Sequence, residues 1–496
     1  LLKNEKNTLP LSKKLKKIAV LGPNANNSIA VLGNYNGTPS KVVNALEGIK
    51  TKVGNHTEVV YEKAVDFTRD TLLRYSDLSG QFSWENQKGF KAEYFNNKDL
   101  SGKPEAVRIE NQIDHIWQEG QEIIGPVRAA HFSARYSASF KAQTNGPINF
   151  ELEGDDGYRF FINGKEVLNA WQRNRWGPKV YTLTTRKDSI YQLVIEYWQG
   201  EGSARLHLRA GHYEKSDFNA IVQQFSDVDA FIFIGGISPQ LEGEEMQVNY
   251  KGFNGGDRTT ILLPEAQTAL LKALHKTGKP VIFVMMTGSA IAIPWEDANL
   301  PAIVNAWYGG QSAGTALADV LFGDYNPAGR LPVTFYKSDA DLPDFKHYDM
   351  SNRTYRYFKG EALYPFGYGL SYSAFKYSKL SIPRSVEAGK DIRVSVTVTN
   401  TGKMAGEEVA QLYLSYPGVT GKAPIRALKG FHRVGLQPGE SKILTFILTP
   451  EELSLVQSNG KPWQPKGKAT VSIGGGQPDI KRKTSGNVLK KQLEIL

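Results

Sequence analysis

Short apolar runs alternate with helix-like stretches in two separated parts of the chain. Strands are predicted at Ile18–Leu21, Glu58–Tyr61, Phe231–Ile234, Val281–Met286 and Ala302–Trp307. Helices are predicted at Val42–Ile49, Glu265–His275 and Thr315–Phe322. Strands that alternate with helices indicate a mostly parallel sheet with helices on both faces. The sequence therefore predicts an α/β sandwich formed by two stretches of the chain.

Two other stretches alternate apolar and polar residues with a period of two. The first runs from Phe90 to about Ala210 and is rich in aromatic residues, and the second begins after Lys376. This pattern, broken by Gly, Asn and Asp turns, is typical of antiparallel β-domains. Because loop tips tolerate inserted domains, the first β-domain is interpreted as an insertion into the α/β domain. The second has sandwich-like strand spacing but no Cys–Trp–Cys framework, so it is predicted to be fibronectin-like, with a tail after Gly475.

These patterns give four predicted segments. They are an α/β sandwich domain in 1–86, an inserted β-sandwich in 87–213, the second part of the α/β domain in 214–374, and a fibronectin type III-like domain with a tail in 375–496. The fold class is thus multidomain α/β plus all-β.

Composition excludes several classes of function. The 496 residues contain no Cys, which excludes disulfides, zinc–thiolate sites and thiol catalysis. The net charge of +10 comes from local Lys and Arg clusters that are typical of solvated surfaces, so nucleic acid is not an expected partner. No apolar run approaches the roughly 20 residues of a membrane-spanning helix. Phosphate-binding and HExxH motifs are absent from the sequence, and neither a metal nor a cofactor is expected.

The segment that follows the predicted strand Phe231–Ile234 carries the strongest candidate chemistry. It breaks at Gly235-Gly236 and then places Glu242, Glu244 and Glu245 on one polar loop. In open α/β sheets, ligands bind beyond the carboxyl ends of the strands. We therefore predict that this loop donates a general acid/base, and that Asp257-Arg258 further along forms an ion pair that anchors it.

A second motif suggests different chemistry. Residues 310–314, GQSAG, match the GxSxG nucleophile elbow between a strand and a helix, which makes Ser312 a candidate esterase nucleophile. Asp344, His347 and His432 follow in the order that a triad requires. No HGGG-type oxyanion element precedes the motif, however, and small residues also serve close packing at strand–helix turns.

The inserted domain resembles the PA14 β-sandwich in the motifs KAEYFNN (91–97), EGDDGYRFFINGKEV (153–167) and IEYWQGEGSARLHL (195–208). In some PA14 lectins an adjacent Asp pair helps bind calcium with sugar, and Asp155-Asp156 occupies that position. Ordering of a hairpin turn is the favoured interpretation of this pair. Trp171 and Trp176 are candidates for stacking on a sugar, with packing of the domain edge as the alternative.

Several long motifs resemble glycoside hydrolase family 3. They are LLKNEKNTLPL at the start, the Glu-rich loop with GGDR, WYGGQSAGTALADVLFGDYNPAGRLPVTF, YPFGYGLSY and LKGFHRV. The resemblance implies a retaining exo-β-glycosidase without a cofactor, whose aspartate nucleophile lies on a TIM-type barrel. The chain has no initiator Met and starts where that barrel would end, so we expect the barrel, the nucleophile and any targeting segment to lie outside it.

The same resemblance assigns the acid/base to the second Glu of an E-x-E motif. That position is Glu244, with Glu242 as the runner-up and Glu245 as a third possibility, because the loop is longer than the usual form. GGISPQLEGEE favours a β-xylosidase over a β-glucosidase.

The expected partners are an oligosaccharide or glycoside substrate, the N-terminal barrel and, as a possibility, a second copy in a homodimer. A periplasmic or secreted location is expected. A carbohydrate-binding or adhesion module is the alternative from another class.

Overall fold

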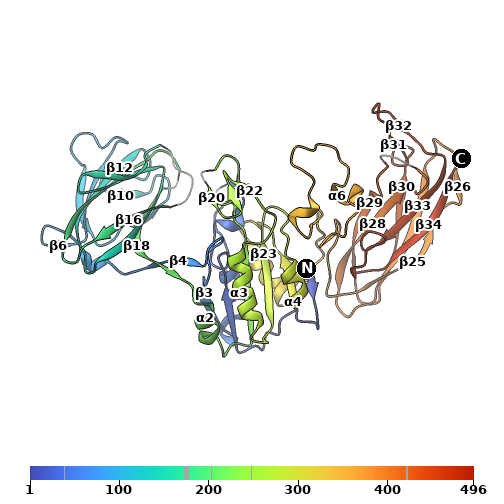
Figure 1. The fold of residues 1–496 in the computed structure, drawn as a ribbon, viewed down its shortest axis with the longest axis horizontal. Coiled ribbons are helices and arrows are strands. Elements are labelled where there is room, and N and C mark those ends of the chain that lie inside the picture. The colour runs from blue at the N-terminus through green and yellow to red at the C-terminus, as the bar shows by residue number, and fades with distance from the viewer. Residues whose placement is uncertain (38, 173–177, 203, 247, 420–422) are drawn as a thin grey trace. The chain divides into compact units, whose positions relative to one another are not determined.

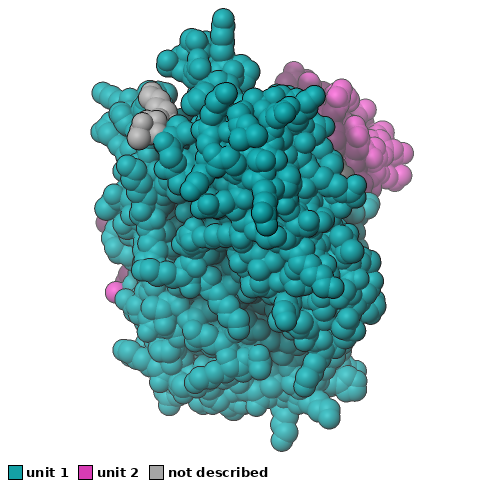
Figure 2. Space-filling model, turned by 90° about the vertical axis from the view of Figure 1, so that its right-hand side faces the viewer, with its two compact units in different colours: residues 1–70, 217–496 teal, residues 71–216 magenta. Residues whose placement is uncertain are grey.

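The computed structural model describes residues 1–37, 39–172, 178–202, 204–246, 248–419 and 423–496. The chain divides into two compact units, which are coloured separately in Figure 2. Unit 1 consists of residues 1–70 and 217–496, and unit 2 consists of residues 71–216. One unit is therefore formed by two separated stretches of the chain, with the other inserted between them.

A six-stranded sheet organises the first part of unit 1 (Figure 1). Its order is β1 (Lys3–Asn4), β24 (Ala302–Asn305), β23 (Val281–Met286), β19 (Ala230–Gly236), β2 (Lys17–Leu21) and β3 (Glu58–Glu62). β1 pairs antiparallel with β24, and the other four pairings are parallel. The carboxyl ends of β2, β19, β23 and β24 therefore meet at one edge of the sheet.

Both faces of this sheet are covered, because its central strands are apolar at every position. Phe231 and Phe233 of β19 pack on the face that also buries apolar residues in or beside α2 (Phe218–Gln224), α3 (Glu265–His275) and α4 (Pro294–Asn299). Ile232 and Ile234 pack on the opposite face, with α1 (Ala45–Val53) and α5 (Ala313–Leu321). Because successive side chains of a strand point to opposite faces, β19 contributes alternate residues to two separate apolar cores.

Two glycines set the close approach of α1 and α5. A Cβ added to Gly314 would lie 1.9 Å from the Asn44 carbonyl oxygen, and one added to Gly48 would lie 2.1 Å from the Gly314 oxygen. Only residues without a side chain fit at these positions. Gly314 of the GxSxG motif is therefore explained by helix packing.

The second part of unit 1 consists of two sheets around one apolar core. One sheet has the order β25 (Phe375–Ser381), β27 (Ile392–Asn400), β30 (Ser441–Leu448). The other has the order β26 (Ser385–Val386), β34 (Val488–Ile495), β33 (Gly467–Gly474), β28 (Gly406–Ser415), β29 (Ala427–Leu436). The expected tail after Gly475 is wrong for its last residues, because Leu493 and Ile495 of β34 are buried in this core.

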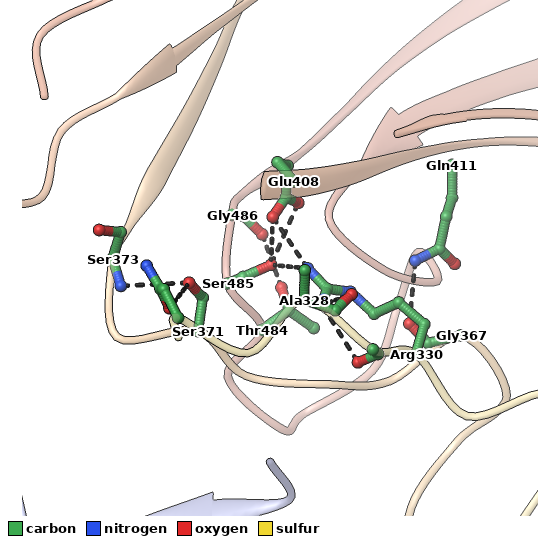
Figure 3. A network of polar contacts seen from close by, with 12 residues as sticks. Ala328, Arg330, Gly367, Ser371, Ser373, Glu408, Gln411, Thr484, Ser485 and Gly486 are labelled. Atoms are coloured by element: carbon green, nitrogen blue, oxygen red, sulfur yellow. Dashed lines mark hydrogen bonds and ion pairs between the residues drawn. The ribbon is translucent and has the colours of Figure 1, made fainter. Parts of the chain in front are cut away.

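A buried polar network lies where this β-part meets the 324–332 turn of the α/β part (Figure 3). The Glu408 carboxylate on β28 accepts hydrogen bonds from Arg330 (2.9 Å), Tyr377 (2.9 Å) and Ser485 (2.8 Å). The Glu408 side chain has no exposed area and that of Arg330 is 7% exposed. Burial raises the pKa of Glu408, and Arg330 opposes that shift. This ion pair links the two parts of unit 1.

Unit 2 consists largely of β-strands in two main sheets. The larger sheet contains β15 (Lys165–Ala170), β14 (Gly157–Ile162), β17 (Ile190–Gln199), β12 (Phe132–Lys141), β5 (Phe82–Trp84) and β6 (Gln87–Lys88), with β7 (Phe90–Phe95) and β8 (Ala106–Glu110) beside them. The other contains β16 (Lys179–Thr185), β13 (Gly146–Asp155), β18 (Ala204–Lys215), β4 (Thr71–Tyr75) and β9 (Asp114–Trp117). The predicted insert, 87–213, lies within unit 2, which starts earlier because β4 pairs with β18.

The remaining elements are short. They are β10 (Glu122–Ile124), β11 (Val127–Arg128), β20 (Asn249–Tyr250), β21 (Phe253–Asn254), β22 (Asp257–Arg258), α6 (Thr354–Tyr357), β31 (Leu455–Val456) and β32 (Pro462–Trp463), with 3-10 turns at Ala30–Leu32, Gly54–His56, Ser79–Gln81 and Asp339–Asp341. Among the described residues, no helix is both long and apolar enough to cross a bilayer.

Candidate active site

The candidate loop begins where β19 ends. Gly236 adopts φ +101°, and a Cβ there would lie 2.0 Å from the Met286 carbonyl oxygen, so the strand must end on glycine. The fully buried Gln267 of α3 accepts from the Gly236 amide (2.8 Å) and donates to its carbonyl (2.7 Å). The loop therefore leaves the sheet from a fixed point.

The small sheet β20–β22 closes the other side of the loop, and its labels lie above the parallel sheet in Figure 1. The Met246 amide donates to the Gly255 carbonyl (2.9 Å), and the Met246 side chain is buried. A Cβ on Gly256 would lie 2.1 Å from the Gly243 carbonyl oxygen. The two segments are in backbone contact, which fixes the turn at residues 243–245.

Glu242 is held by donors that follow two other strands of the sheet. Its Oε1 accepts from the Gly288 amide (2.8 Å) and the Tyr308 hydroxyl (3.0 Å), and its Oε2 accepts from the Ser289 hydroxyl (2.8 Å). Burial, with the nearby Glu242 charge, raises the pKa of Tyr308. With donors on both oxygens, Glu242 is an anchored acceptor.

Arg258 supports this anchor through Ser289, and within the described residues it forms no hydrogen bond or ion pair with Glu242 itself. Its Nη1 donates to the Ser289 hydroxyl (3.0 Å) and to the Ala290 carbonyl (2.8 Å). Burial lowers the pKa of Arg258, and the Glu242 charge opposes that shift. The expected Asp257–Arg258 ion pair is wrong within the described residues, because the guanidinium reaches the 289–290 segment instead.

Glu244 differs from Glu242 in both exposure and partners. It is exposed, and its Oε2 accepts one hydrogen bond, 2.8 Å long, from the Tyr35 hydroxyl. Tyr35 is 89% exposed, and its hydrogen bond to Glu244, together with the Glu244 charge, raises the pKa of its hydroxyl. Glu245 is exposed too and adopts φ +49° at the turn. The carboxylates of Glu244 and Glu245 are thus exposed to solvent, whereas that of Glu242 is held by hydrogen bonds.

Four adjacent strands contribute to this arrangement. Glu242 and Glu244 follow β19, Gly288 and Ser289 follow β23, Tyr308 follows β24, and Tyr35 follows β2. Their carboxyl ends meet at one edge of the sheet, the usual place for a ligand site in such folds. Sequence reasoning missed Tyr35, Ser289 and Tyr308, although each lies in a turn-rich segment shortly after a predicted strand.

The structure does not support the alternative in which Ser312 is the nucleophile of an esterase triad. Ser312 directly precedes α5, and its side chain makes no capping hydrogen bond. Among the described residues, Asp344 accepts from the Lys346 amide and His432 Nε2 lies 3.2 Å from the Thr445 carbonyl. Within the described residues, no hydrogen bond joins Ser312 to Asp344, His347 or His432, so the triad order in the sequence does not correspond to an assembled triad.

The candidates in unit 2 have structural contacts. The Arg159 guanidinium lies 4.0 Å above the Trp171 ring, whose backbone carbonyl accepts from Trp198 Nε1 (2.8 Å). Trp176 lies outside the described residues. The Asp156 side chain is buried between β13 and β14 and accepts from the Gly200 amide (2.8 Å). The described part of the chain contains no group of three or more His, Asp or Glu residues that could hold a metal ion.

Comparison with known proteins identifies the family. Residues 1–372 match the Glycosyl hydrolase family 3 C-terminal domain. The chain belongs to glycoside hydrolase family 3. Residues 408–477 match the fibronectin type III-like domain, in agreement with the second β-part of unit 1.

Proteins similar to this chain carry xylosidase and glucosidase names. A xylan 1,4-beta-xylosidase of Xylanibacter ruminicola is 37% identical over 97% of this chain and 55% of its own length. A periplasmic beta-glucosidase of Salmonella typhimurium is 40% identical over 45% of this chain and 31% of its own. The crystal structure of a beta-glucosidase from Kluyveromyces marxianus matches with a TM-score of 0.69 and 26% identity over 100% of this chain and 61% of that one. The chain thus spans about half the length of the X. ruminicola relative.

Proposed function

We propose that this chain supplies the general acid/base of a retaining exo-β-glycosidase that removes terminal β-linked sugars. Glu244 is the acid/base, and an aspartate on an N-terminal barrel is the nucleophile. The observation that carries this assignment is the contrast between two carboxylates of one loop. Among the described residues, Glu242 accepts hydrogen bonds from three donors, whereas Glu244 is exposed and accepts from a single hydroxyl group.

The chemistry requires a carboxyl group that can both give and take a proton. Glu244 first protonates the leaving oxygen and later activates the water that attacks the glycosyl-enzyme. This role needs access to substrate, which the exposed tip of the loop allows. The nucleophile has to lie about 5–5.5 Å from this carboxyl group in a retaining enzyme. Glu242 then acts as the positioning residue of the loop.

The substrate is proposed to be a terminal β-D-xylose, with β-glucose as the alternative within the family. The X. ruminicola relative, named a xylosidase, is similar over 97% of this chain. We further propose a periplasmic or secreted location, which agrees with the name of the Salmonella relative. The inserted unit is proposed to be a PA14 domain, in which Asp155-Asp156 orders a hairpin turn.

The test uses the full-length protein with its barrel. Glu244→Ala should lower turnover of an aryl xyloside with a poor leaving group by roughly 10²–10⁴-fold. Azide should restore turnover of an activated aryl xyloside to this variant, because azide needs no general base. Rescue of Glu242→Ala but not of Glu244→Ala would move the assignment to Glu242. Paired nitrophenyl β-xyloside and β-glucoside substrates decide between the two sugars.

A further inference from the structure

A cleft of about 710 Å³ lies within unit 1, between the α/β part and the fibronectin-like part. Its lining comes from segments 334–365, 425–426 and 477–482 and from two residues of α4. No described residue of the acidic loop, and neither Tyr35 nor Tyr308, contributes to this lining. The volume lies in the range of small-molecule sites, roughly 300–1,000 Å³. The cleft is therefore large enough for a ligand and separate from the candidate active site.

The cleft has an excess of positive charge once its ion pairs are taken into account. Each of the three acidic residues in its described lining has a cationic partner. Glu361 pairs with Lys337 (2.9 Å), Asp297 pairs with Arg482 (2.6 Å), and Asp479 pairs with Lys490. Within the described residues, the lining groups Lys359, Arg426 and Lys481 form no ion pair. Three cations thus remain to attract an anion.

Arg426 is the most constrained of these cations. It is half-buried, and its Nη1 donates to the buried Gln477 Oε1 at 2.7 Å. Burial lowers the pKa of Arg426, and Asp479 opposes that shift. A guanidinium held in this way offers its other N–H groups in a planar fork, the geometry that suits a carboxylate.

The remaining wall of the cleft is apolar and aromatic. The Tyr355 ring stacks on Phe366 at 4.2 Å, and its hydroxyl accepts from the Leu428 amide. The Phe358 ring meets the Tyr336 ring edge-on at 4.9 Å. Both rings are fixed by these contacts before any ligand arrives. Fixed aromatic side chains provide contact area at little entropic cost, as in many ligand pockets.

We propose that this cleft binds an acidic saccharide, that is, a sugar that carries a carboxylate. The carboxylate contacts Arg426 and the two lysines, Lys359 and Lys481, and the apolar face of the sugar ring lies against Tyr355 and Phe358. A small inorganic anion would use the charges but leave the aromatic wall uncovered. A neutral sugar would use the wall but leave the three cations unpaired. The inference does not depend on the role of Glu244.

Binding is measured on the 496-residue chain by calorimetric titration in low salt. Methyl β-D-glucuronide is the probe, methyl β-D-glucoside has the same ring without the charge, and inorganic phosphate has the charge without the ring. We expect glucuronide to bind at least about tenfold more tightly than either comparison ligand, and to weaken as salt screens the charges. Equal binding of glucuronide and glucoside, equal binding of glucuronide and phosphate, or no glucuronide binding would overturn the proposal.

Two sets of variants locate the site. Lys359→Gln with Lys481→Gln removes two exposed cations and should weaken glucuronide binding by about tenfold, whereas Lys390→Gln with Lys461→Gln removes two exposed lysines that do not line the cleft and should leave it unchanged. Arg426→Lys keeps the charge but removes the planar fork, so it should also weaken binding. Thermal melting checks that each variant is folded. Undiminished binding in both cleft variants would refute the assignment of the site.

Discussion

The Glu408–Arg330 pair allows a direct test of how the two parts of unit 1 are joined. Arg330→Met removes the guanidinium and leaves the Glu408 carboxylate without its cation. Breaking a buried ion pair in this way costs about 3–5 kcal/mol, because one charge stays buried without compensation. Tyr377 and Ser485 still donate to Glu408, so we expect the lower end, about 3 kcal/mol of unfolding free energy.

The pH dependence gives this prediction its sign. Burial already holds the pKa of Glu408 above its ordinary value, and Arg330 is the main group that opposes the shift. In the variant the folded-state pKa of Glu408 rises further above the unfolded value. The stability of the variant is then greatest at a pH below the pKa that Glu408 has in the unfolded state. It falls as the pH rises through the pKa that Glu408 has in the folded state. The penalty of Arg330→Met should therefore be larger at pH 8 than at pH 5.

Urea denaturation followed by tryptophan fluorescence measures the effect, with the two compact units fitted separately if they unfold in two steps. The neighbouring residue on β28 supplies a matched control. Glu407 pairs with Arg433, but these side chains are 37% and 54% exposed, so Arg433→Met should cost less than about 1 kcal/mol. A loss at Arg330→Met no larger than at Arg433→Met, or one that does not change with pH, would refute the reasoning.

Three further variants test other parts of the fold and site. Gly314→Ala places a Cβ 1.9 Å from a carbonyl oxygen of the adjacent helix and should cost about 1–3 kcal/mol or more, whereas Gly329→Ala meets open space and should be near neutral by urea denaturation. Gln267→Leu leaves the buried Gly236 amide and carbonyl without their side-chain partner and should cost about 1–3 kcal/mol in the same assay. In the full-length protein, Tyr35→Phe removes the hydroxyl that contacts Glu244 and should lower kcat for poor leaving groups more than for activated ones; an equal loss for both substrates would contradict a contact with the acid/base.

Local pattern was sufficient to predict the five parallel strands of the α/β part, the helices α1, α3 and α5 and the place of the acidic loop, but not β1, α2 or α4. The run Phe231–Ile234 could be recognised as a buried strand because every position is apolar, and the loop could be placed because Gly235-Gly236 ends that strand. The start of unit 2 could not be predicted in the same way. β4 (Thr71–Tyr75) has no clear alternation, and its assignment depends on pairing with β18, about 140 residues later.

The different environments of the glutamates also depend on contacts that are distant in sequence. The LEGEEM segment gives Glu242 and Glu244 nearly the same local neighbours. What separates them is the donors, since those of Glu242 come from 288, 289 and 308 and that of Glu244 comes from Tyr35, more than 200 residues earlier. The sequence pattern can therefore place an acidic loop at the edge of the sheet. It cannot predict which of the carboxylates is held by hydrogen bonds from distant residues.

The anchored Glu242 has a consequence for the proposed chemistry of Glu244. A group that transfers protons has to keep its geometry within fractions of an ångström, yet the tip of a solvent-exposed loop is a poor place for such precision. Here the anchor lies two residues away, and it fixes the loop through strands β23 and β24 while Tyr35 approaches from the β2 side. Loss of the anchor should therefore affect both proton transfers alike. Glu242→Gln in the full-length protein should lower kcat without azide rescue, in contrast to Glu244→Ala, and rescue of both variants would show that the two residues share one role.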